Sequence, residues 1–111
     1  MIRERDKSRK ILNALVDYFV AMDFRELVTS IAMKEEVTEI VIEGIVDGSK
    51  VDVEKIKKLL NHPRMHEYED MYDNILESNT EEELDTIGYF IDEARVNLDG
   101  DALSMKLSRF H

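Results

Sequence analysis

Apolar positions in the first fifth of the chain predict an amphipathic helix. From Lys7 to Met22 they recur at the 3.6-residue period and form one stripe of six residues: Ile11, Leu12, Leu15, Val16, Phe19 and Val20. Polar residues such as Asp17 fall outside this stripe. We therefore expect a helix over residues 7–22 that packs on a sheet, preceded by a frayed end over residues 1–6.

Two segments with strand character follow the predicted helix. Leu27–Met33 alternates between two sets of residues, and Val37–Val46 is rich in Val and Ile, with Ile40 and Ile42 on one face. The polar residues 34–36 between them predict a hairpin loop, and Asp47-Gly48-Ser49 has the composition of a turn. Apolar residues occur on both faces of the two segments, which indicates that more than one sheet face is covered, as dimerisation would achieve.

A short helix and a second helical segment occupy the middle of the chain. Val53, Ile56 and Leu60 are spaced as a helical stripe, and Asp52 is a candidate N-cap. Residues 61–63 should end this helix, because Pro63 is suited to the first turn of a new one. The new helix is predicted by a stripe of apolar and aromatic residues: Met65, Tyr68, Met71 or Tyr72, and Ile75 or Leu76.

Residues 81–98 fit two structures. Thr80 and Glu83 match a capping box, which favours a helix, whereas Tyr89-Phe90-Ile91 and the alternation around them favour a strand. Gly88 would cost a helix interior about 1 kcal/mol. The alternating segment Leu103–Leu107 also needs a partner across the turn at 98–101. We predict a strand over 86–98, preceded by a helical turn at 80–83.

These elements predict a single α+β domain over residues 7–111. Its architecture is a two-layer arrangement of about three helices and a four-stranded antiparallel sheet built from two hairpins, in the order α-ββ-αα-ββ. Local patterns do not determine the order of the strands. The length of 111 residues suits one core, and the absence of cysteine excludes disulfides and thiolate chemistry.

The sequence shows neither a signal peptide nor a stretch that could span a membrane. Apolar runs reach only about four residues, far short of the ~18 that span a bilayer. The first residues also lack the apolar core of a signal peptide. We therefore expect a cytoplasmic protein with no membrane partner.

The charge of the chain is concentrated in its second part. The formal net charge is −10, yet residues 1–64 hold 12 basic and 12 acidic side chains, against 3 and 13 in residues 65–111. The stretch 65–94 contains no Lys or Arg. Nucleic-acid binding is disfavoured, because it normally needs a basic face. The acidic stretch is either a solvated surface or the footprint of a basic partner or a divalent cation.

One pattern invites a metal-site hypothesis. His62 and His66 stand four residues apart with Glu69 beyond them, and a continuous helix would bring two imidazoles and a carboxylate together. Pro63 interrupts that helix and no HExxH pattern is present. Capping or surface histidines are the simpler interpretation, so no cofactor is expected.

The candidate partner-binding residues surround the start of the acidic stretch: Arg64, Glu67, Tyr68, Asp70 and Asp73. Arg64 is suited to a surface pair with Glu67 or Glu69, or to an anionic ligand near a helix N-terminus. Tyr68 and the methionines near it would form either part of the core or an adaptable groove for a partner.

No catalytic residue is predicted. The sequence lacks GxSxG, a P-loop and GxGxxG, and no pair of its many carboxylates stands out. We expect a small acidic, non-enzymatic interaction or regulatory module that binds a partner protein or a second copy of itself. One alternative is a ligand-binding or metal-binding domain, or a small enzyme, that uses His62, His66 and nearby carboxylates. A third possibility is an acidic mimic of nucleic acid.

Overall fold

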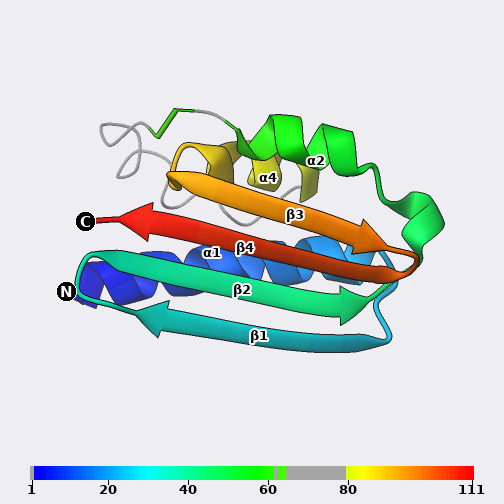
Figure 1. Cartoon of the computed structure of the whole chain (residues 1–111), viewed down its shortest axis with the longest axis horizontal. Helices are drawn as coiled ribbons and strands as arrows, with labels where there is room; N and C mark the ends of the chain where they lie inside the picture. Colours follow the sequence, from blue (N-terminus) through cyan, green and yellow to red (C-terminus); the bar gives the residue numbers. More distant parts are fainter. Residues whose placement is uncertain (1, 62, 65–79) are drawn as a thin grey trace.

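The chain begins with a long helix, α1 (Ile2–Ala21), that lies against one face of a sheet (Figure 1). The structure is a computed structural model and describes residues 2–61, 63–64 and 80–111. Residues 2–6, expected to fray, form the first turns of α1. They are held there because the Glu4 carboxylate accepts hydrogen bonds from Arg109, 105 positions along the chain.

The structure confirms the first hairpin that the sequence pattern predicts. β1 (Glu26–Met33) pairs antiparallel with β2 (Val37–Ile45), and the loop falls at residues 34–36 as predicted. Ile40 and Ile42 of β2 are fully buried beneath the helices. Gly44 is required near the end of β2, because a Cβ there would lie 2.6 Å from the Glu26 carbonyl oxygen and 3.1 Å from Phe19 of α1.

The second hairpin places its last strand in the middle of the sheet. β3 (Glu93–Asp99) and β4 (Ala102–Phe110) pair antiparallel across a two-residue turn, in which Gly100 adopts a left-handed φ of 62°. The strand order is β1-β2-β4-β3, so β4 lies between β2 and β3 and the edges are β1 and β3.

A 3-10 turn and a short helix follow the first hairpin. η1 (Gly48–Lys50) leads into α2 (Val53–Leu60), whose N-cap is Asp52, as predicted: its side chain accepts a hydrogen bond from the Lys55 N–H at 3.1 Å. The helix ends before Asn61. The further helix expected after Pro63 falls outside the described residues.

The prediction for residues 86–92 was wrong. A helix, α4 (Thr80–Gly88), occupies the first part of this stretch, and the strand starts only at Glu93. Gly88 is the last residue of α4 and not an interior one, so its penalty is small. Leu84, Ile87 and Ile91 are all buried, so the spacing that also fits an alternating strand serves a helix and the turn after it.

The core fills the space between the helices and one face of the sheet. Ile11, Leu15 and Phe19 of α1 meet the inward residues of the two central strands. Three of these inward residues belong to β4: Leu103, Met105 and Leu107. The fold class is therefore α+β, as expected, with the described helices on one face and no described helix on the opposite face, which we call the open face (Figure 1). None of the described helices combines the length and apolarity needed to cross a membrane.

Candidate functional site

Most of the residues singled out from the sequence lie outside the described residues. The expected metal ligands His62, His66 and Glu69 lie outside the described residues. So do four of the five expected partner-binding residues: Glu67, Tyr68, Asp70 and Asp73. Only Arg64 of this set is described. Within residues 2–61, 63–64 and 80–111, no group of three or more His, Asp and Glu side chains is placed to hold a metal ion.

Arg64 is engaged inside the fold. Its guanidinium Nη1 lies 2.8 Å from Asp92 Oδ2 and donates to the Phe110 carbonyl oxygen at 2.8 Å. Asp92 Oδ2 also accepts the Phe110 N–H at 2.7 Å. The Arg64 side chain is only 8% exposed. Arg64 therefore ties the segment after α2 to the start of β3 and the end of β4, a contact that sequence spacing did not suggest.

A second arginine, which is fully buried, closes the same end of the sheet. Arg109 is 1% exposed and binds both carboxylate oxygens of Glu4, at 2.8 and 2.7 Å, as well as the Phe90 carbonyl oxygen at 2.6 Å. Burial raises the pKa of Glu4, but the hydrogen bonds and charge of Arg109 outweigh it and hold that pKa below its usual 4.5. This pair is structural, because it anchors α1 to β4.

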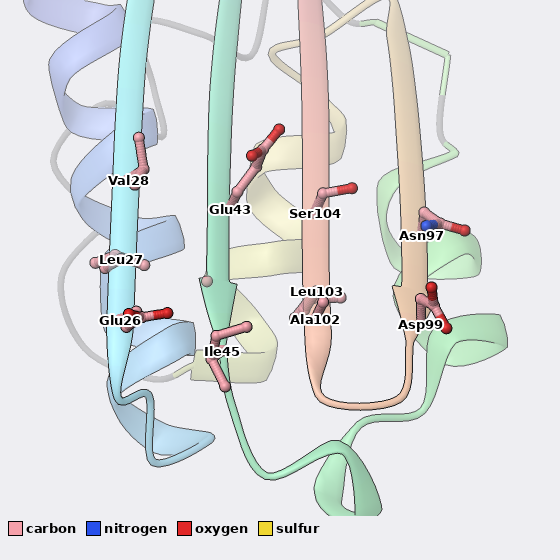
Figure 2. Close-up of a pocket in the computed structure, with 11 residues that line it drawn as sticks. Glu26, Leu27, Val28, Glu43, Ile45, Asn97, Asp99, Ala102, Leu103 and Ser104 are labelled. Atoms are coloured by element: carbon pink, nitrogen blue, oxygen red, sulfur yellow. The ribbon is translucent and has the colours of Figure 1, made fainter.

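The open face of the sheet carries polar side chains and two hollows. Figure 2 shows the larger, an open hollow of about 410 Å³ across the ends of all four strands, with Glu43 beside Ser104 and with Asn97 and Asp99 on β3. The smaller hollow contains Glu39. Hydrogen bonds from Lys106 and Lys34 lower the pKa of Glu39 to about 2, so this carboxylate stays ionised and paired.

The most unusual surface of the described structure is the outer edge of β1. Seven of its eight residues are exposed, and Glu26 is its only charged side chain. Val28 is 68% exposed on the open face, and Ile31 and Met33 are each 37% exposed on the helix face. No other described strand pairs with this edge. Native proteins usually protect such an edge with charges, proline or a covering element.

One flank of α1 extends this apolar surface. Phe19 lies beside Leu27, and Arg5 lines a hollow with Met33, so this flank of α1 runs beside β1. Helical spacing places three further apolar residues on the same flank: Leu12, Val16 and Val20. Leu12 and Val16 are half-buried, and Val20 is 56% exposed. We call β1 together with these three residues the β1 edge surface.

The opposite edge of the sheet is protected. β3 carries Glu93, Arg95 and Asp99 on its open face, and α2 packs against it (Figure 1). Charged side chains and a neighbouring helix are the usual means of preventing strand addition. The alternating apolar residues of Leu27–Met33 were the sequence signal for an interaction surface, but only the strand order shows that this strand is an edge.

Comparisons with known proteins do not assign the chain to a family. No family model, no curated protein and no solved structure matches the chain.

Proposed function

We propose that the protein is a non-enzymatic interaction module that binds an extended protein segment along the β1 edge surface. The observation that carries the proposal is an eight-residue edge strand with one charge and exposed apolar side chains on both faces. A segment added to such an edge gains main-chain hydrogen bonds, and alternate side chains give specificity.

The described charged groups support a binding role over a chemical one. Arg109 and Glu4 hold α1 to β4, and Arg64 and Asp92 hold the ends of the last two strands. Glu39 is shared between two lysines. These groups stabilise the fold, whereas the apolar side chains of Val28, Ile31 and Met33 on β1 remain partly exposed.

Selection of peptides from a random display library tests the proposal. The chain should select segments of about eight residues with apolar side chains at alternate positions. Val28→Lys should weaken their binding about tenfold or more, ~1.4 kcal/mol, because it places an ammonium group within the docking edge in place of its most exposed apolar side chain. Isothermal titration with the selected peptides measures this effect.

The matched control is Asn97→Lys. Asn97 is exposed on the open face of the other edge strand, so this variant makes the same change in net charge away from β1. It should bind the selected peptides as the unchanged chain does. Peptides that bind the Val28→Lys variant at full affinity, or a selection that yields none, would refute a docking role for this edge.

A further inference from the structure

We infer that the occupant of the β1 edge is a second copy of the chain, paired antiparallel through β1 about a two-fold axis at Ser30. The inference rests on the proposed function, since it names the partner of the same surface. In the resulting dimer two four-stranded sheets would join into one continuous sheet. Closed two-fold pairing of this kind is the commonest form of oligomer.

The hydrogen-bond pattern of β1 restricts how two copies can pair. The Lys34 N–H donates to the Val37 carbonyl oxygen at 2.9 Å, which makes these residues a hydrogen-bonded pair of the β1–β2 ladder. Bonded and non-bonded pairs alternate along an antiparallel ladder. Val28, Ser30 and Ala32 therefore bond to β2, and the residues between them direct their backbone groups outward: Leu27, Thr29, Ile31 and Met33.

The outward residues must face one another across the new interface. The outward residues are every second residue of β1, so the midpoint between any two of them falls on a residue. The two-fold axis therefore passes through a residue and not between two residues. An axis at Ser30 pairs the whole segment from Leu27 to Met33. It sets Leu27 opposite Met33 of the second copy, Val28 opposite Ala32 and Thr29 opposite Ile31, so that apolar side chains meet on both faces of the sheet.

Charge selects this register over its neighbours. With the axis at Ser30, Glu26 stands opposite Lys34 of the second copy, and the symmetry makes this favourable pair twice. An axis at Ile31 would set Glu26 against Glu36, two like charges. An axis at Thr29 would leave Glu26 opposite Ala32, without an opposite charge. Lys34 already pairs with Glu39 on the open face, which is the face that Glu26 shares.

The helix layer complements the same arrangement. Leu27, Ile31 and Met33 lie on the helix face of β1, where the two copies would form one apolar row. The α1 flanks of both copies, with Val16 and Val20, would border that row from either side. The dimer would thus cover side chains that one copy leaves exposed, including Ile31 and Met33.

Cysteine cross-linking tests the register, because the chain has no cysteine of its own. In the proposed dimer Ser30 faces Ser30 of the second copy in a non-hydrogen-bonded pair, with Cα atoms about 4.5 Å apart. That separation suits a disulfide. Under mild oxidation with oxidised glutathione, the full-length Ser30→Cys variant should form a covalent dimer, seen on a non-reducing gel.

Ala32→Cys is the matched control. Ala32 lies on the same strand and face and is also exposed, but two copies of it would be about 13 Å apart. It should cross-link at least about tenfold more slowly than Ser30→Cys, because only chance collisions bring its thiols together. A mixture of Val28→Cys and Ala32→Cys chains should give the mixed dimer, since these two residues face each other.

Sedimentation separates this inference from the proposed function. The unmodified chain should sediment at twice 13.0 kDa at micromolar concentration, and Val28→Lys should sediment as a monomer. A monomeric chain that still selects β1-binding peptides would overturn the second-copy inference and leave the proposed function standing. A dimer in which Ser30→Cys reacts no faster than Ala32→Cys would overturn it equally.

Discussion

At the scale of single residues, two arginines join parts of the chain that are distant in sequence, and one of them, Arg109, is fully buried. Arg109 holds Glu4 across 105 positions, and Arg64 holds Asp92 across 28. Breaking a buried pair by removing one charge is expensive, because the remaining charge is left without compensation. Arg109 and Glu4 therefore matter to stability far more than their polar character suggests.

The Glu4–Arg109 pair predicts acid sensitivity. The pKa of Glu4 is lowered in the folded protein from 4.5, so its stabilising contribution is complete above that pH and is lost as the pH falls through the folded value. Glu4→Gln should lower the free energy of unfolding at neutral pH by about 3 kcal/mol. The stability of this variant should also fall less steeply than that of the unchanged chain below about pH 4.5.

Urea unfolding at pH 7 and at about pH 3.5 measures both effects. Glu35→Gln is the control, because Glu35 is exposed in the β1–β2 loop and should change stability by less than about 0.5 kcal/mol. Equal slopes of stability against pH for Glu4→Gln and the unchanged chain would contradict the role assigned to the pair.

At the scale of elements, the predictions succeeded where one periodicity dominates a segment. The first hairpin, α2 and its Asp52 cap, and the alternating core residues of β4 all follow from patterns within a few residues. The strand predicted over residues 86–92 was wrong because the spacing of Ile87 and Ile91 suits both a strand and a helical turn. The choice depends on packing of Leu84 and Ile87 into the core, which local pattern does not contain.

Two other features depend on contacts across the chain. The early start of α1 depends on Arg109, and the edge position of β1 depends on β4 entering between β2 and β3. The sequence therefore predicted an apolar strand with two covered faces, but not that the strand would be exposed at an edge. Of the predicted site residues, only Arg64 is described, and its partner Asp92 lies too far along the chain to be inferred from spacing.

The amide hydrogen exchange rates of β1 in a dilute sample should differ between its two sets of residues. Val28, Ser30 and Ala32 bond to β2 and should exchange slowly, whereas Leu27, Thr29, Ile31 and Met33 should exchange quickly. On raising the protein concentration, only the second set should gain protection, because pairing along the edge engages its amides. Uniform protection along β1 at every concentration would contradict an open edge.

At the scale of the whole molecule, the net charge of −10 and the β1 edge surface make opposite predictions about salt. Binding through β1 depends on main-chain hydrogen bonds and apolar contact, so its affinity should change little between about 0.05 and 0.5 M salt. Binding through the acidic stretch would weaken strongly over the same range. Titration of the selected peptides at several salt concentrations distinguishes the two surfaces.

Charge-reversal variants also distinguish binding at the β1 edge surface from binding at the acidic stretch. Replacing Glu67, Asp70 and Asp73 with Lys should leave affinity at β1 unchanged, as should the same change at Glu43 on the open face. A large loss of affinity confined to the first three variants would instead assign binding to the acidic stretch, which the sequence had suggested.

The central position of β4 also has a consequence for the order of folding. Each hairpin closes over a short turn, and such hairpins form in about 1–10 μs. Joining them requires β4 to reach β2, and contacts there link residues as far apart as Thr38 and His111, 73 positions along the chain. Closure of so long a loop carries a large entropic cost before any contact offsets it. The union of the two hairpins should therefore limit the folding rate, and until it occurs both β2 and β4 are open to pairing with other chains.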